Sequence, residues 1–472
     1  MEIEILSREL VKPSSPTPSH LRDYKLCLLD QFFPKYHGGI IFFYSVNPDI
    51  IHANNSQNDN VDENYYCRIL KKSLSDTLTD FYPIAGRFKG TSTIDCNDDG
   101  ASVVEAKLNS TLSDFLVSVS QSSGNPYQEL GKLVLSLDSE TMELASNCML
   151  IAQITIFECR GVAISFCLEH RFCDLSSVVV FLKGWSARAR GGSGGEIAVP
   201  DFVGSSFLPP QDMPPLPPLA NLIENGTTTR LVLDSSKISA LKSKFITESG
   251  ELLSPISTNN LSRVEVVLAL ILKSAISAAR SVTASAAKSV ILCAVNLRNR
   301  TALPLSENSI GNLIWFPQVT IEEGENVEFH EVVSKIKRET ASFYDETVRR
   351  IRNDEEGNAL VFEAMKRREE VIKSVDDVNT YDCSSWCRFP VYEMDFGWGR
   401  PVWVSSGVVS SRNLIVFVDT KCGSGIQAWV TFHPKVMAVF ERDEELLSFA
   451  SLNLVFLFSF FCMQVVQLLI SL

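Results

Sequence analysis

Residues Gly161–Trp185 read GVAISFCLEHRFCDLSSVVVFLKGW. The first ten are rich in β-branched and aromatic side chains, which is typical of a buried strand, and they end at His170. The residues that follow indicate a helix that begins near Asp174. The stretch therefore predicts a strand, a tight connection and a helix, with a histidine held in the connection. Loops of this kind often carry functional side chains.

His170 is the best candidate for a general base, because the chain has only six histidines and imidazole titrates near neutral pH. The other five lie in loop-like stretches, in an acidic helix or directly before a proline: His20, His37, His52, His330 and His433.

Asp174, four residues after His170, has two interpretations. It can be simply the N-cap of the helix, accepting a backbone N–H, or it can belong to a functional pair with the histidine. The HxxxD spacing alone does not decide between them.

The chain as a whole is acidic and has an ordinary folded composition. Its 472 residues are 45% hydrophobic, and 43 Lys plus Arg against 56 Asp plus Glu give a net charge of −13. Such a surface repels polyanions, so we expect no nucleic acid partner. Several of the twelve cysteines stand in apolar runs and predict buried, reduced thiols. The N-terminal MEIEILSREL lacks the features of a signal peptide, so we expect a cytoplasmic protein.

The clearest break in the chain is Gly191–Leu219, which combines a glycine cluster with seven prolines. Such a composition is typical of an exposed linker. We therefore predict an N-terminal domain over 1–190, a crossover over 191–225 and a C-terminal domain over 226–453. Short strand-like runs alternate with amphipathic helical segments in both halves, which indicates a mixed α/β class.

The last segment, 454–472, carries no charge and is just long enough to cross a bilayer. Four polar residues interrupt it and no Lys or Arg flanks it, which argues against an anchor. We expect no membrane association except through this segment, which we place outside the fold.

A second unusual stretch is DFGWG, Asp395–Gly399, with two glycines and two aromatic residues. Glycines permit a positive φ and aromatics pack over neighbouring surfaces, so the simplest prediction is an architectural loop. Cys383 and Cys387 lie nearby but lack the four ligands of a structural zinc site, and we expect no metal.

Six motifs together resemble the plant BAHD acyltransferases, and most closely their vinorine synthase-like branch, which acetylates alkaloids and alcohols. They are YPIAGR (Tyr82–Arg87), HRFCD (His170–Asp174), SRVE (Ser262–Glu265), VNLRNR (Val295–Arg300), GNLIWF (Gly311–Phe316) and DFGWG (Asp395–Gly399).

The resemblance implies two chloramphenicol acetyltransferase-like domains, each a mixed sheet with flanking helices, and a channel between them. His170 would lie midway along the channel as general base. Acyl-CoA, with acetyl-CoA as the expected donor, would enter from one face and a small acceptor from the other. It implies no metal, no bound cofactor and a monomer.

The resemblance also suggests roles for other residues. Asp174 would turn away from the histidine and structure the loop by pairing with Arg298. Asp395, Gly397, Trp398 and Gly399 would be structural. Two further positions, Ser262 and Arg388, match positions that lie towards CoA in relatives.

Two features depart from the family pattern. The residue after the motif aspartate is usually Gly or Ala, whereas Leu175 stands here and would narrow the channel or displace His170. Relatives also end soon after the equivalent of Asn453, so the apolar segment that follows looks foreign to the fold.

The leading hypothesis is therefore an acyl-CoA-dependent O- or N-acyltransferase of plant specialised metabolism that transfers a small acyl group. One alternative is a hydroxycinnamoyl transferase that makes phenolic esters. Another, from a different class, is a catalytically silent relative that binds a ligand, because a fold alone does not establish a function.

Overall fold

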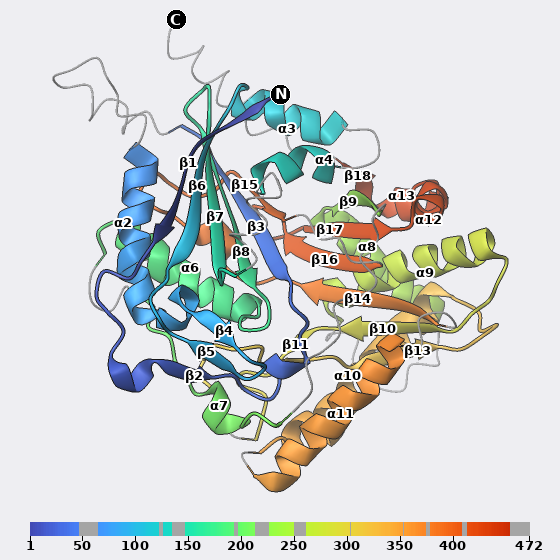
Figure 1. Ribbon diagram of the computed structural model, residues 1–472. Helices are drawn as coiled ribbons and strands as arrows, with labels where there is room; N and C mark the ends of the chain where they lie inside the picture. The colour runs from blue at the N-terminus through green and yellow to red at the C-terminus, as the bar shows by residue number, and fades with distance from the viewer. Residues whose placement is uncertain are drawn as a thin grey trace, which may run out of the picture.

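A computed structural model describes residues 1–46, 65–121, 126–134, 147–192, 197–212, 226–249, 261–302, 304–352, 354–373, 378–407 and 413–453. Two large sheets stand side by side, each with helices packed against it (Figure 1). The predicted α/β class with two mixed sheets and flanking helices is confirmed.

The first sheet has six strands, and only the β6–β7 pair is parallel. Its strands lie in the order β1 (Ile3–Val11), β6 (Ala101–Leu108), β7 (Leu150–Phe157), β8 (Val162–Glu169), β3 (His37–Tyr44) and β15 (Trp403–Ser406). Its main helices are α2 (Tyr65–Asp80), α3 (Leu112–Gln121), α4 (Tyr127–Leu130) and α6 (Leu175–Ala189). Helices α2 and α6 pack against one another, and Trp185 of α6 donates to the carbonyl oxygen of Leu70 in α2 at 3.1 Å.

The second sheet has seven strands, in the order β13 (Gln318–Ile321), β10 (Ser289–Cys293), β14 (Asn379–Ser385), β16 (Leu414–Asp419), β17 (Ile426–Phe432), β9 (Thr227–Leu233) and β18 (Ser451–Leu452). Its helices are α8 (Ser235–Ser249), α9 (Arg263–Thr283), α10 (Phe329–Glu346), α12 (Pro434–Phe440) and α13 (Glu444–Phe449). Within the described ranges only α9 is long and apolar enough to span a membrane. Most of its apolar side chains are buried in the second core.

Smaller elements complete the fold. One small sheet consists of β2 (Asp23–Lys25), β4 (Arg87–Lys89) and β5 (Thr93–Asp95), and another pairs β11 (Val295–Asn296) with β12 (Ile314–Trp315). The 3-10 turns are η1 (Ser19–Leu21), η2 (Asp30–Phe32), η3 (Tyr82–Ala85), η4 (Gly131–Leu133), η8 (Val348–Arg350) and η9 (Val391–Glu393). The remaining helices are α7 (Gly204–Phe207) and α11 (Glu355–Lys373). Helix α10 is followed directly by the separate turn η8.

Strand β15 comes from the C-terminal half of the chain but pairs with β3 of the first sheet. All four of its residues are buried. The two segments of the chain approach closely just beyond the strand, where the N–H of Gly407 donates to the oxygen of Gly39 at 2.7 Å. A Cβ on Gly407 would lie 2.7 Å from the Gly39 backbone, so the close approach requires glycine. One segment of the second half is thus built into the first sheet.

The described part of the Pro- and Gly-rich crossover, residues 197–212, is less exposed than its composition predicted. Phe207 in α7 and Leu208 after it are buried in a third core, and Asp201 forms a bridge with Ser309. Pro200, Pro209 and Pro210 lie outside helices and strands, whereas Phe207 and Leu208 between them are buried. The exact domain boundaries stay a prediction, and 213–225 and 454–472 lie outside the described residues.

All described cysteines are free. Seven are buried as expected, whereas Cys159 and Cys422 are exposed because they lie in surface turns.

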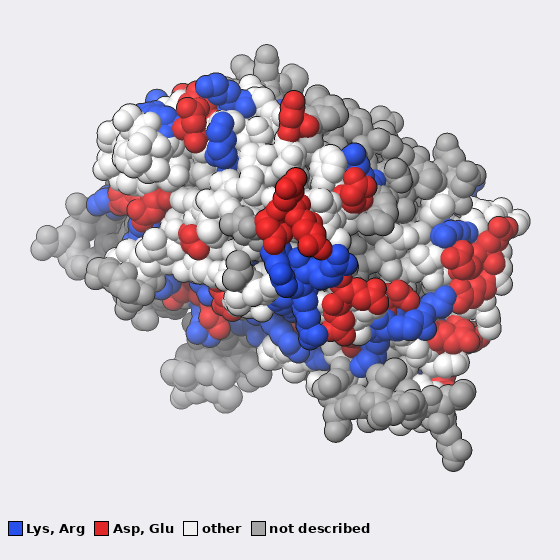
Figure 2. Space-filling model, turned by 90° about the horizontal axis from the view of Figure 1, so that it is seen from below, with Lys and Arg blue, Asp and Glu red and all other residues white. Residues whose placement is uncertain are grey.

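Charge on the surface is mixed. On the face seen from below, Lys and Arg side chains gather near the middle and acidic side chains border them (Figure 2). Basic and acidic side chains are therefore adjacent on this face.

Candidate active site

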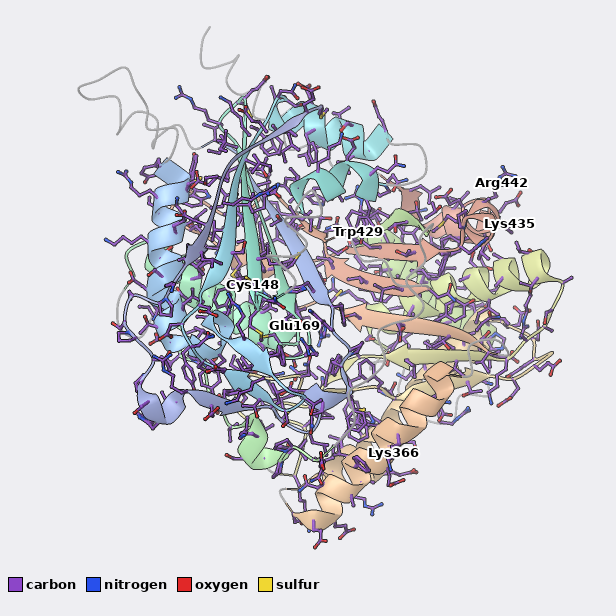
Figure 3. The ribbon with its side chains drawn as sticks, viewed as in Figure 1. Cys148, Glu169, Lys366, Trp429, Lys435 and Arg442 are labelled. Carbon is purple, nitrogen blue, oxygen red and sulfur yellow. The ribbon has the colours of Figure 1, made fainter. Side chains whose placement is uncertain are left out.

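The connection after β8 holds His170 firmly. Glu169 lies at the end of β8 near the middle of the molecule (Figure 3). His170 follows it and donates its backbone N–H to the oxygen of Tyr36 at 2.9 Å. The imidazole of His170 stacks on Phe33 and Tyr36, with ring centroids 5.1 and 4.7 Å away. Backbone pairing and two aromatic contacts thus restrict both the position and the tilt of the ring.

The environment of His170 favours the neutral imidazole. Burial lowers the pKa of His170 below its ordinary value of 6.5, although the negative charges of Asp174 and Glu169 act in the opposite direction. The Nδ1 atom is buried and has no hydrogen-bond partner among the described residues. A general base near neutral pH requires an imidazole in its neutral form, which this environment favours.

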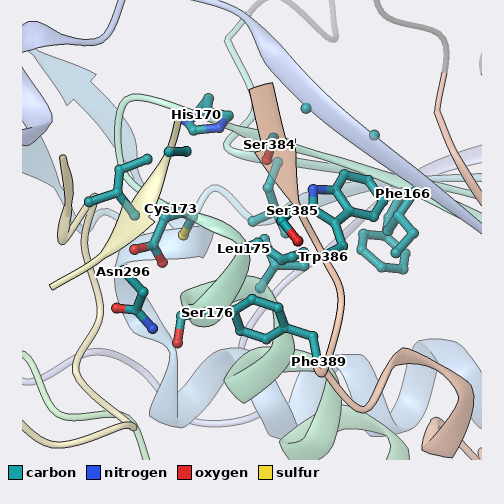
Figure 4. A pocket seen from close by; sticks show the side chains of 18 residues that line it. Phe166, His170, Cys173, Leu175, Ser176, Asn296, Ser384, Ser385, Trp386 and Phe389 are labelled. Atoms are coloured by element: carbon teal, nitrogen blue, oxygen red, sulfur yellow. The ribbon is translucent and has the colours of Figure 1, made fainter. Parts of the chain in front are cut away.

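His170 lines a cavity of about 120 Å³ between the two sheets (Figure 4). The walls are mostly apolar, with a few hydroxyl and amide groups. They are formed by Gly38, Gly39, Ile40, Phe166, Leu168, Cys173, Asp174, Leu175, Ser176, Val178, Ala294, Asn296, Ile314, Ser384, Ser385, Trp386 and Phe389. Residues from both halves of the chain contribute, so the cavity exists only where the halves meet.

A second cavity of about 400 Å³ adjoins the first and shares Ser176, Asn296 and Phe389 with it. Its lining is polar and rich in cations. The remaining lining residues are Val179, Val180, Lys183, Arg298, Asn299, Arg300, Glu307, Asn308, Arg388 and Pro390. A cationic chamber therefore lies next to the cavity that holds the histidine.

Asp174 caps helix α6 and also pairs with Arg298. One carboxylate oxygen, Oδ1, accepts the N–H of Ser177 at 2.9 Å and caps helix α6. Both of its oxygens also accept from Arg298, at 2.6 and 3.1 Å, and both side chains are only 1% exposed. Among the described residues Asp174 makes no hydrogen bond to His170, and its carboxylate is turned towards Ser177 and Arg298 instead.

Arg298 extends the contact further. Its guanidinium also donates to the carbonyl oxygens of Ser309 and Gly311, at 2.6 to 3.1 Å. The loop before β12 is thereby tied to the start of α6.

The DFGWG loop lies among aromatic rings of the first core. Oδ1 of Asp395 accepts the N–H groups of Gly397 and Gly399 at 2.8 and 2.9 Å, and both glycines have φ above 100°. Trp398 is buried and stacks on Phe396. None of these residues lines either cavity.

The two predicted CoA contacts differ in their positions. Ser262 is the N-cap of α9 in a capping box with Glu265 and lines neither cavity. Arg388 is exposed and lines the cationic cavity. Asp419 links their neighbourhoods, because it pairs with Arg263 at 2.9 Å and accepts the N–H of Arg388 at 2.7 Å.

Several lining residues received no role from the sequence. Asn296 belongs to a quoted motif, and Trp386 lies just before DFGWG. Gly38 stands beside the histidine, where an added Cβ would lie 3.3 Å from the imidazole Cδ2. In the sequence, the Gly38–Gly39 pair is the one local signal that could have indicated a close approach of the backbone at this site.

A model of the Transferase family matches residues 1–447. The chain belongs to this family, the BAHD acyltransferases. The resemblance drawn from the motifs is thus confirmed, and the chain is an acyltransferase.

Characterised members of the family are similar over nearly the full length. Stemmadenine O-acetyltransferase of Catharanthus roseus is 33% identical over 94% of this chain and 97% of its own. Akuammiline synthase 1 of Alstonia scholaris is 35% identical over 95% and 98%.

Two solved structures share the fold. The crystal structure of vinorine synthase superimposes with a TM-score of 0.76 at 30% identity, over 95% of this chain and 99% of that one. The F. graminearum TRI101 structure, which contains coenzyme A and deoxynivalenol, gives 0.63 at 16% identity, over 91% and 99%, and supports the fold alone.

Because Asp174 pairs with Arg298 as well as capping α6, its replacement should lower the stability of the protein more than replacement of an aspartate that only caps a helix. Asparagine caps helices as well as aspartate does, so Asp174→Asn should keep the cap but leave the Arg298 charge buried and unpaired. We expect a loss of about 3–5 kcal/mol in the free energy of unfolding, measured with urea.

Asp443→Asn is the matched control. Asp443 caps α13 through the N–H of Leu446 and makes no salt bridge among the described residues. It should change stability by less than about 0.5 kcal/mol. Equal effects of the two substitutions would mean that capping is the only task of Asp174.

Proposed function

We propose that this acyltransferase moves an acyl group, preferentially acetyl, from acyl-CoA to a hydroxyl or amine of a plant specialised metabolite such as an alkaloid or alcohol, with His170 as general base. The observation that carries the proposal is a buried histidine that lines an apolar cavity, which shares three lining residues with a neighbouring cationic chamber.

The chemistry follows from the groups in the cavity. Neutral His170 takes the proton of the acceptor hydroxyl or amine while that oxygen or nitrogen attacks the thioester carbonyl carbon. The tetrahedral intermediate collapses, the C–S bond breaks, and the imidazolium returns the proton to the CoA thiolate. The Ser385 hydroxyl and Trp386 indole N–H line the cavity and can donate to the oxyanion.

The cationic chamber suits the other end of the donor. CoA carries phosphates, and Lys183, Arg300 and Arg388 bring positive charge to the lining. The shared residues Ser176, Asn296 and Phe389 then mark where the pantetheine arm would pass towards His170.

The small cavity favours a small acyl group. Leu175 and the rings of Trp386 and Phe389 project into it (Figure 4). A hydroxycinnamoyl group would need a wider cavity, which makes that donor the second choice. The names of the relatives, several of them acetyltransferases, agree with acetyl transfer.

Other properties extend the proposal. We place the enzyme in the cytoplasm as a monomer, on its sequence features and on the resemblance. A silent relative would instead lack turnover while binding acyl-CoA.

His170→Ala should abolish transfer, because no other residue that lines the cavity is a histidine. The measurement is mass spectrometry of products formed from isotope-labelled acetyl-CoA and a pooled plant alcohol and alkaloid extract. His330→Ala, on the surface of α10, is the control and should retain full activity. Equal product from the His170→Ala enzyme would contradict the mechanism, and no product from any donor would favour the silent relative.

The activity should persist into mildly acidic solution. Only neutral His170 can accept a proton, so kcat/KM falls as the pH drops through the pKa of His170, which burial lowers. We expect the acidic limb of the pH profile below about 6.5, the ordinary histidine pKa. A limb above pH 7 would show that a different group is the base.

Leu175→Ala should change the choice of donor. Removing the branched side chain enlarges the cavity, and one or two methylene groups typically change selectivity about 10-fold or more. We expect the ratio of kcat/KM for hydroxycinnamoyl-CoA to that for acetyl-CoA to rise about 10-fold. The control Leu447→Ala, at an exposed leucine of α13, should leave the ratio unchanged. An unchanged ratio in Leu175→Ala would mean that Leu175 does not limit the acyl group.

A further inference from the structure

Behind His170 lies a buried polar pair that the mechanism above does not use. Asn312, from the loop before β12, is fully buried, and Asp30 in the turn after β2 is 1% exposed. Oδ1 of Asp30 accepts both the backbone N–H of Asn312, at 2.6 Å, and its side-chain amide, at 3.1 Å. Two residues 282 positions apart are thus locked together.

The same amide reaches the histidine. Nδ2 of Asn312 donates to the carbonyl oxygen of His170 at 2.6 Å. Both protons of this amide nitrogen are therefore engaged, one by Asp30 and one by the backbone of the candidate base.

Two buried atoms remain without a partner in this place. They are Oδ1 of Asn312 and Nδ1 of His170, one an acceptor and the other a nitrogen that can carry a proton. Buried polar atoms are rarely unpaired, and such a complementary pair on contacting residues suggests that the two atoms meet during the reaction cycle.

We propose that Asn312, anchored by Asp30, is a positioning residue that fixes the orientation of His170 and keeps the imidazole proton on Nδ1, so that Nε2 faces the acceptor with its lone pair free. The inference rests on the proposed function, because it assigns Asn312 a task only if His170 is the base.

Asp30 is suited to the anchoring task. Besides Asn312, it accepts the backbone N–H of Cys27 at 2.9 Å, through its other oxygen. Burial raises the pKa of Asp30 to about 6, while these hydrogen bonds lower it. The carboxylate is thus held by several hydrogen bonds, and at pH 7 or above it is mostly ionised and a strong acceptor.

The groups around His170 leave Asn312 a distinct role. Glu169 is paired with Arg171, and Asp174 with Arg298, so neither carboxylate is free to orient the imidazole. The other neighbours with titratable groups are Tyr36, which stacks on the ring, and Cys173 and Asp30, which are buried. Among the described residues, only Asn312 combines a contact to His170 with an unpaired acceptor.

The first test is Asn312→Ala, assayed with the labelled acetyl donor. Misplacing a catalytic group by about 1 Å can cost about 10²-fold, so we expect kcat to fall about 10²-fold. The KM for acyl-CoA should stay within about 3-fold, because the CoA chamber lies elsewhere. Asn326→Ala, at an exposed asparagine that lines neither cavity, is the matched control and should match the unsubstituted enzyme. A kcat within 3-fold of that of the unsubstituted enzyme would overturn the proposal.

A double substitution tests the anchor. Residues that act as one unit have non-additive effects, so Asp30→Asn combined with Asn312→Ala should be no slower than Asn312→Ala alone. Multiplicative losses would show that Asp30 and Asn312 act independently.

A measurement on the unsubstituted enzyme avoids the risk that these variants fail to fold. In ¹⁵N-histidine spectra at pH 7.5, with the His170 signals assigned by their loss in His170→Ala, the proton should reside on Nδ1. A proton on Nε2 would overturn the inference. If His170→Ala keeps its activity, the proposed function fails; if it is inactive while Asn312→Ala is normal, only the present inference fails.

Discussion

The buried ion pair between Arg298 and Asp174 is the interaction on which the site depends. The two residues come from opposite halves of the chain, and both side chains are almost fully withdrawn from water. Burying two charges is costly and is tolerated only with good geometry and full hydrogen bonding, which the guanidinium obtains from Asp174 and from the carbonyls of Ser309 and Gly311. The start of α6, and with it the His170 loop, is therefore held by the second half of the molecule.

Other contacts across the seam between the sheets act in the same direction. Strand β15 extends the first sheet with residues of the second half. Beside it, the buried guanidinium of Arg230 lies over the rings of Trp403 and Trp429, 5.2 and 5.7 Å from their centroids (Trp429 is labelled in Figure 3). Both cavities are lined by residues from the two sides of this seam. The contacts across the seam therefore hold His170, the apolar cavity and the cationic chamber in fixed positions relative to one another.

Sequence reasoning succeeded where the physics is local. The strand before His170 and the N-cap at Asp174 follow from the composition of one short stretch, and both are present. The partner Arg298, 124 positions away, came only from the resemblance. The insertion of β15, the Asp30–Asn312 contact and the burial of Leu208 in the crossover could not be predicted, since each depends on which distant surfaces meet and no spacing rule reports that.

The central claim is that acyl-CoA reaches His170 through the cationic chamber, and a crystal structure of the enzyme with CoA would test it most directly. The account predicts the phosphates of CoA beside Arg300 and Arg388 and the thiol in the apolar cavity, within reach of the imidazole. CoA bound with its thiol away from His170, or its phosphates outside this chamber, would contradict the account.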